Sequence, residues 1–267
     1  MMRQLGFIGT GNMGGALARA AALDAENALL LANRHAEKAQ SLLAALGGTG
    51  EVVDNVTAAA RADYLFLGVK PYLLKTVMDE IGDTLRARQT PAVLVSMLAG
   101  TTIETIQTAL GRRDPVIRIM PNTPVAVGEG LILYDCSGEV TEAQEQDFLR
   151  AMAHAGRSSR LEEHLLDAGS AVSGCGPAFA ALFLEALADG GVACGLPRHK
   201  ALAYAAQMLR GTAQLLLETG EHPGALKDAV CSPGGTTIQG VRTLEEAGFR
   251  GAVMDAVIAA YEKTKAL

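Results

Sequence analysis

A glycine-rich turn near the N-terminus constrains the fold of this chain more than any other feature. The turn, Gly9-Thr10-Gly11-Asn12-Met13-Gly14, directly follows a short apolar run and opens a helical pattern. Gly9 permits a tight turn, Gly11 lets the backbone approach a pyrophosphate, and Gly14 lets helix and strand pack closely. The helix N-terminus then presents unpaired N–H groups to an anion. The pattern predicts a dinucleotide site; the alternative is a glycine-rich turn without a ligand, because glycine is frequent here.

The first 160 residues alternate short apolar runs with amphipathic stretches, which favours a parallel sheet covered by helices on both faces. The expected strands are Gln4–Ile8, Ala28–Ala32, Tyr64–Val69, Ala92–Met97, Val116–Met120 and Leu131–Tyr134. The expected helices include Ala36–Leu46, Pro71–Leu85 and Thr102–Leu110. A capping box of Thr141 and Gln144 predicts a further helix that ends near Gly156.

After Arg160 the pattern is helical, and no further strand is expected. The predicted helices are Glu163–Ala188, Pro197–Thr219, Gly224–Val230, Thr236–Ala247 and Gly251–Lys265. We therefore expect an α/β doubly wound domain over 1–160 and an all-α domain over 161–267.

Long uncharged stretches in the second domain predict self-association. No charge lies between Lys200 and Arg210, or from Gly211 to Leu217. A helix that is apolar on nearly all sides must be buried on nearly all sides, and a small helical domain has too little interior for this. We expect a homodimer or larger; the alternative is a monomer that leaves alanine-rich faces exposed. The uncharged run Ala168–Leu184 is interrupted by three glycines and a proline, so no membrane span is expected.

Composition excludes several other classes of protein. The chain has 23 Lys and Arg against 29 Asp and Glu, with no basic run, which argues against nucleic acid as a partner. The four cysteines form no Cys-x-x-Cys pair and no His lies at metal-ligand spacing from them, so neither disulfides nor a metal are expected. The first eight residues are too short for a signal-peptide core. These features predict a cytoplasmic protein.

The residues after the second predicted strand indicate which dinucleotide binds. Asn33 occupies the position where a carboxylate would accept the ribose hydroxyls of NAD, and Arg34 follows it. This pair has no charge that repels a 2′-phosphate and one guanidinium that can bind it. NADP(H) is therefore expected to be preferred, with NAD(H) possible; alternatively, Arg34 is only a solvated charge.

A second glycine-rich loop, Cys231-Ser232-Pro233-Gly234-Gly235-Thr236-Thr237, lies before a predicted helix. Its backbone N–H groups would form a nest suited to a carboxylate, and Thr237 adds a hydroxyl that can donate or accept. The alternative is an ordinary, well-capped turn between helices. No general base is evident: His222 is the nearest histidine, and Lys200 and Lys227 read as solvated charges.

These motifs together resemble those of the pyrroline-5-carboxylate reductase family. The resemblance covers nearly the whole chain and rests on segments 7–13, 69–71, 118–124, 173–179, 195–198 and 232–238. The segment Ser232–Ile238 is the most specific of them. Cys175 stands where the family usually has Ser, and Phe179 where Tyr is common, which puts in doubt only the hydrogen bonds of the missing hydroxyls.

The resemblance implies a Rossmann-type domain, a helical dimerisation domain, and NAD(P)H-dependent reduction of 1-pyrroline-5-carboxylate to L-proline. By carry-over, Ser232, Gly234, Gly235 and Thr236 would bind the substrate, and Thr237 would contact the ring nitrogen as the catalytic residue. The cofactor would be held by residues of the first domain: Gly9, Thr10, Gly11, Asn12, Met13, Gly14, Asn33, Arg34, Asn55, Val69, Lys70 and Pro71. The family also implies a homodimer or a decamer of dimers.

Two other functions remain open from the sequence. One is a reductase of the same architecture that acts on another cyclic imine or on a β-hydroxy acid, although no lysine base for the hydroxy acid is evident. The other is an NADP-sensing protein without turnover, against which the intact Ser232–Thr237 loop argues.

Overall fold

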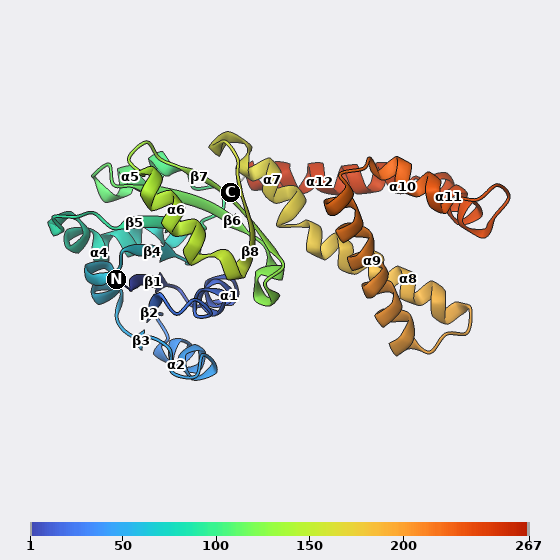
Figure 1. Cartoon of the computed structure of the whole chain (residues 1–267). Coiled ribbons are helices and arrows are strands. Elements are labelled where there is room, and N and C mark those ends of the chain that lie inside the picture. Colours follow the sequence, from blue (N-terminus) through green and yellow to red (C-terminus); the bar gives the residue numbers. More distant parts are fainter. Residues whose placement is uncertain (1, 266–267) are drawn as a thin grey trace. The chain divides into compact units, whose positions relative to one another are not determined.

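The computed structural model describes residues 2–265, and the chain forms two compact units (Figure 1). One unit contains residues 2–175 together with 260–265, and the other contains 176–259. The sequence pattern predicts a boundary at 160/161, where strands give way to helices. The units divide later because α7 (Leu166–Ser173) packs against strands β6 and β7 of the sheet.

The first unit is built on an eight-stranded sheet with the order β3-β2-β1-β4-β5-β6-β7-β8. Neighbouring strands are parallel except β6 and β7, which are antiparallel. The strands are β1 (Arg3–Ile8), β2 (Asn27–Ala32), β3 (Glu51–Val52), β4 (Tyr64–Leu67), β5 (Val93–Ser96), β6 (Val116–Pro121), β7 (Gly130–Cys136) and β8 (Gly156–Arg160). The chain reverses its direction of strand addition between β1 and β4, so the doubly wound fold class is confirmed. Strands β3 and β8 were not predicted.

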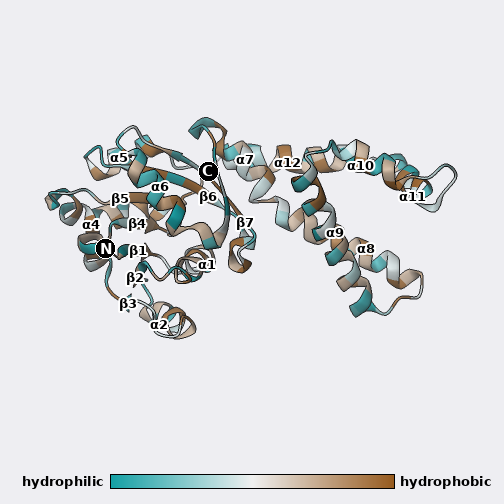
Figure 2. Ribbon diagram, in the orientation of Figure 1, coloured by the Kyte–Doolittle hydropathy of each residue, from teal (hydrophilic) through white to brown (hydrophobic). Residues whose placement is uncertain are grey.

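Helices cover both faces of this sheet, and each face has its own apolar core. On one face lie α1 (Asn12–Ala21), α2 (Ala36–Ala45) and α6 (Glu142–Ala151). On the other lie α3 (Asn55–Arg61), α4 (Leu74–Ala87) and α5 (Ile103–Leu110). The rings of Phe7 and Phe66 stack with centroids 4.4 Å apart in the first core. Figure 2 shows the apolar colouring of the central strands that these helices bury.

The capping box at the start of α6 is confirmed, but the predicted end of this helix is wrong. Thr141 accepts from the backbone N–H of Gln144, whose side chain accepts from Thr141 N–H. The helix ends at Ala151, and a 3₁₀ turn (Ala153–Ala155) leads into β8 at Gly156. Gly156 has φ of +122°, which a helix does not allow.

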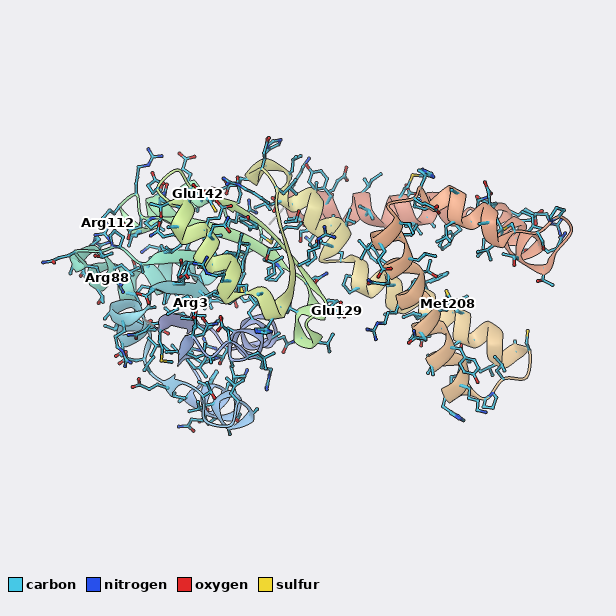
Figure 3. The ribbon with its side chains drawn as sticks, viewed as in Figure 1. Arg3, Arg88, Arg112, Glu129, Glu142 and Met208 are labelled. Carbon is cyan, nitrogen blue, oxygen red and sulfur yellow. The ribbon has the colours of Figure 1, made fainter. Side chains whose placement is uncertain are left out.

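Arginine side chains satisfy the carboxyl ends of two helices at the edge of the first unit (Figure 3). Arg112 donates to the carbonyl oxygens of Leu85 and Arg86, each at 2.8 Å. Arg88 donates to the carbonyl oxygen of Ala59 at 2.7 Å. These guanidiniums pair with carbonyl groups that have no partner within the helix and complement the negative end of the helix dipole.

The second unit is helical, as expected, and has almost no interior of its own. It contains α8 (Gly176–Ala193), α9 (Arg198–Thr219), α10 (Pro223–Val230), α11 (Thr236–Glu246) and most of α12 (Phe249–Lys265). Within residues 176–259 only Ala188, Ala201 and Ala205 are buried. Large apolar side chains are exposed instead, such as Met208 on α9 at 46% (Figure 3).

The uncharged run at 168–184 lies in two consecutive helices, because α7 ends at Ser173 and α8 begins at Gly176, so the single helix predicted over Glu163–Ala188 is divided. Residues Glu163–Ala193 form a helical stretch that is long and apolar enough to cross a membrane by length and composition, with 11% of the window buried. Gly174 keeps right-handed helical dihedrals, and Pro177 lies at the start of α8, where its missing N–H costs nothing. Length and composition alone do not distinguish a membrane span from a helix that another chain covers.

Candidate active site

The glycine-rich turn lies at the carboxyl ends of β1 and β4, where the strand order reverses. Gly9 has φ of +98°, and a Cβ there would lie 2.5 Å from the carbonyl oxygen of Gly68 after β4. A Cβ on Gly14 would lie 2.1 Å from the carbonyl oxygen of Gly9. Real Cβ atoms do not approach backbone oxygens this closely. Turn, helix and neighbouring loop are therefore in backbone contact, as predicted for a site of this kind.

Gly11 differs from these two glycines because a Cβ there would meet no atom of the chain within 4 Å. It is the N-cap residue of α1 and provides no side-chain cap for the first helical turn. The first N–H groups of a helix have no acceptor within it. These donors face open space beside a residue with no side chain, so the turn fits a pyrophosphate.

Asn33 joins the end of β2 to the glycine-rich turn. Its Nδ2 donates to Thr10 Oγ1 at 2.9 Å, and its Oδ1 accepts from His35 N–H at 3.1 Å. Thr10 is itself buried, whereas Arg34 is exposed. Asn33 thus holds both loops together without adding a negative charge.

The other predicted cofactor residues lie near the same edge of the sheet. Val69 and Lys70 follow β4, and Pro71 begins the 3₁₀ helix Pro71–Leu73. Asn55 is the first residue of α3, and its Nδ2 donates to Glu80 Oε2 on α4 at 2.8 Å. Because β4 is the parallel neighbour of β1, the residues after β4 lie beside the turn that begins at Gly9.

A cavity of about 590 Å³ opens beside the turn, between α1 and α2. Its lining includes Thr10, Gly11 and Asn12 from the turn. Arg19 of α1 and Lys38 of α2 also line it, whereas Arg34 does not. The sequence does not indicate a role for Arg19 or Lys38, because both lie on helices at positions typical of solvated charges.

The second glycine-rich loop lies in the second unit, between α10 and α11. Gly234 has φ of +70°, and Gly235 N–H donates to the carbonyl oxygen of Ser232 at 3.0 Å. Gly235 is the N-cap of α11 and offers no side chain to the first turn. A Cβ on Gly235 would lie 2.3 Å from Ser232 Oγ, so only glycine lets the serine hydroxyl lie over this helix start. The first-turn amides of α11 and the exposed hydroxyls of Thr236 and Thr237 form one polar surface.

His222, the histidine nearest to this loop in the sequence, has a structural role. It is the N-cap of α10, and its Nδ1 accepts from Gly224 N–H at 3.0 Å. The nitrogen that a general base would use is therefore occupied.

The structure also identifies residues to which the sequence analysis gave no role. Asn122 follows β6; its Oδ1 accepts from Leu131 N–H at 2.8 Å and its Nδ2 donates to the carbonyl oxygen of Ser173 at 3.0 Å. It therefore ties the end of α7 to the sheet. The sequence motif at 118–124 contains Asn122, but only the fold shows which backbone groups the Asn122 side chain connects. Within residues 2–265, no group of three or more His, Cys, Asp or Glu side chains is placed to hold a metal ion.

Comparison with known proteins identifies relatives of this chain both in sequence and in structure. Residues 163–267 match the family profile for pyrroline-5-carboxylate reductase dimerisation, and residues 4–100 match a profile for coenzyme F420-dependent NADP oxidoreductases. The chain is 40% identical to a pyrroline-5-carboxylate reductase of Glycine max, over 98% of this chain and 95% of that protein. It is 39% identical to the Escherichia coli K12 enzyme of the same name, over 100% and 99%.

The fold agrees with these relatives. A crystal structure of Plasmodium falciparum pyrroline carboxylate reductase with NADP bound has a TM-score of 0.87 and 31% identity, covering 100% of this chain and 99% of that one. The similarity spans the glycine-rich turn, the sheet and the helical unit with its second loop. This chain therefore belongs to the pyrroline-5-carboxylate reductase family.

Proposed function

We propose that this chain reduces 1-pyrroline-5-carboxylate to L-proline with NAD(P)H as the electron donor. One observation carries the proposal: two helices, α1 and α11, begin at a glycine N-cap, Gly11 and Gly235, with no side chain capping the first-turn N–H groups. The first suits the pyrophosphate of a dinucleotide and the second the carboxylate of a small substrate.

The residues of the first unit fit the cofactor. The α1 amides at Gly11 to Met13 would hold the pyrophosphate, and the side of the turn at Thr10 and Asn33 would face the adenosine ribose. Asn55 and Val69 to Pro71 would contact the remainder of the nucleotide. When bound, the nicotinamide supplies the hydride that C5 of the pyrroline ring accepts.

The second loop would bind and orient the substrate. The amides of Gly234 and Thr236, with the Ser232 hydroxyl, would bind the carboxylate, and Gly235, whose N–H donates to the Ser232 carbonyl oxygen, would hold the loop in shape around it. Thr237 would hydrogen-bond the ring nitrogen and keep its proton directed along that bond. A protonated cyclic imine is already a strong hydride acceptor, so orientation at C5 is the main requirement and no strong base is needed.

Thr237→Ala tests this role. Loss of one positioned hydrogen bond at the reacting centre is expected to lower kcat/KM for pyrroline-5-carboxylate by about 10- to 1000-fold. Thr243→Ala on the same helix is the matched control, because Thr243 donates only to the Gln239 carbonyl oxygen. The assay is NADPH oxidation; Thr237→Ala activity within a factor of two of wild type would remove Thr237 from the mechanism.

We also propose that NADPH is preferred over NADH. The support is the absence of a carboxylate at position 33 and the presence of Arg34 beside it. Arg34→Ala should reduce the ratio of kcat/KM for NADPH to that for NADH. An unchanged ratio rejects the role of Arg34.

For the assembly we propose a homodimer built through the second unit, with a decamer of dimers as the larger possibility. The dimerisation profile over 163–267 and the nearly coreless second unit support it. We place the protein in the cytoplasm, without a nucleic-acid or membrane partner. Fractionation of cells into soluble and membrane material tests the location. Sedimentation of the soluble protein tests the assembly.

A further inference from the structure

The cavity between α1 and α2 contains two cationic side chains without a partner. Arg19 and Lys38 both line it, and among residues 2–265 neither side chain makes an ion pair or a hydrogen bond. Arg3 in the same unit, by contrast, is paired with Asp24 and Glu26. Two unpaired positive charges on different helices therefore face one cavity of about 590 Å³.

This cavity borders the place where an adenosine ribose would lie. Thr10 lines the cavity and accepts a hydrogen bond from Asn33, the first residue after β2. In doubly wound folds the ribose hydroxyls lie at the end of this strand. The cavity thus extends from the ribose position toward Lys38 and Arg19, while the exposed Arg34 does not line it.

Dinucleotides that carry a 2′-phosphate place extra negative charge at this ribose position. Lysine and arginine are the usual ligands of such phosphates, through charge-assisted hydrogen bonds. The same cavity is lined by Glu37, which would oppose an anion. Removal of the Lys38 or Arg19 charge should therefore weaken binding of a 2′-phosphate, whereas removal of the Glu37 charge should strengthen it.

We propose that Lys38, assisted by Arg19, binds the 2′-phosphate of NADP(H) and contributes to the preference for NADPH over NADH. Glu37 limits the strength of this binding. The inference rests on the proposed cofactor use and deepens it, because it adds residues in the groove between α1 and α2 to Arg34 as determinants of cofactor specificity.

Calorimetry with two nucleotide fragments tests this directly. The probes are adenosine 2′,5′-bisphosphate and AMP, which differ only in the 2′-phosphate, and the protein is the full chain. Lys38→Gln should weaken binding of the bisphosphate by about tenfold, Arg19→Gln by less, and neither should change the affinity for AMP. Glu37→Gln should strengthen binding of the bisphosphate alone.

Lys75→Gln is the matched control, an exposed lysine on α4 paired with Asp79. Turnover gives a second readout: the ratio of kcat/KM for NADPH to that for NADH should fall in Lys38→Gln without a change in kcat. Unchanged bisphosphate affinity in Lys38→Gln, or an equal loss of affinity for AMP, overturns the proposal. Wild-type protein that binds AMP but shows no preference for the bisphosphate also overturns it, while reduction of pyrroline-5-carboxylate by the same protein would leave the proposed function intact.

Discussion

Gly9, Gly11 and Gly14 show that one short motif contains glycines for different physical reasons. At Gly9 and Gly14 a side chain would collide with backbone oxygens of the chain itself, whereas at Gly11 it would meet nothing. The sequence spacing predicted the tight turn at Gly9 and the close packing at Gly14, and the approach of Gly11 to a pyrophosphate stays a prediction. Charges around the site were harder to predict, because the direction of Arg19 and Lys38 depends on how α1 and α2 pack.

Gly14→Ala and Gly11→Ala should separate stability from ligand binding. The alanine at position 14 should cost on the order of 3 kcal/mol or more of unfolding free energy, because the new Cβ meets the Gly9 carbonyl. The alanine at 11 should cost at most about 1 kcal/mol, the scale of a changed N-cap, yet weaken NADPH binding. Thermal unfolding and calorimetry measure the two quantities. Equal destabilisation by both variants would contradict this assignment.

Cys136 should react slowly with alkylating agents. Burial, with a smaller effect from the charge of Glu145, raises the pKa of its thiol to about 12. The pKa is higher in the folded than in the unfolded chain, so the contribution to stability is present below pH 9 and is lost as the pH rises toward 12. Iodoacetamide at pH 8, followed by mass spectrometry, should modify Cys136 at least about 100-fold more slowly than in denaturant. Comparable rates of Cys136 modification in the folded protein and in denaturant would contradict a raised thiol pKa.

At the scale of elements, the apolar parallel strands were predictable, and the polar or very short ones were not. Strands β1, β2, β4, β5 and β6 are buried runs with a clear signal. Strand β8 is Gly-Arg-Ser-Ser-Arg at an edge, and β3 has two residues, so neither has an apolar pattern to detect. The antiparallel pairing of β7 was not predicted either, because it depends on the short connection through the 3₁₀ helix Thr123–Val127.

Helix α7 is held on the sheet by a buried charge. Arg118 on β6 is 2% exposed and donates to Asp167 Oδ1 at 2.6 Å, with Glu163 Oε1 at 3.6 Å. Glu163 also accepts from Ile103 N–H at 2.6 Å and so caps α5. Gly169 lies against Leu133, where a Cβ would be 2.5 Å from Leu133 Cδ1. Arg118 therefore links β6 to α7 through Asp167, and links β6 to α5 through Glu163.

Asp167→Asn should lower the unfolding free energy by about 2–3 kcal/mol, because it leaves a buried guanidinium without its closest anion. The double variant Arg118→Met with Asp167→Asn should cost less than Arg118→Met and Asp167→Asn added together. Lys75→Met, which removes an exposed pair with Asp79, should cost less than about 0.5 kcal/mol. Calorimetric unfolding at one fixed protein concentration measures all of these, and strict additivity would argue against a coupled pair.

At the scale of the whole molecule, the uncharged helices predicted from the sequence correspond to a unit that cannot bury its own apolar surface. Leu182 is 68% exposed, Leu217 is 66% and Met254 is 60%. The family profile over this region is a dimerisation profile. Sequence alone indicated that a second copy is needed, but the pairing geometry depends on both copies and is not encoded in any local pattern.

Leu182→Glu combined with Met254→Glu should prevent self-association, because two charges would be buried without partners. Leu23→Glu, at a site 69% exposed in the first unit, is the control and should assemble normally. Sedimentation velocity at micromolar concentration measures the result. A monomeric wild type, or a double variant that assembles as the wild type does, would contradict the proposed dimer.

The scarcity of buried residues in 176–259 also has a consequence for the life of a newly made chain. The first unit can complete its two cores alone, whereas the second gains its hydrophobic stabilisation only after an encounter with another copy. Maturation should therefore follow second-order kinetics, with a half-time that shortens as synthesis increases. Until that encounter, helices α8 to α12 are the segment that chaperones and proteases would engage first, so abundance of this enzyme should depend more than linearly on its rate of synthesis.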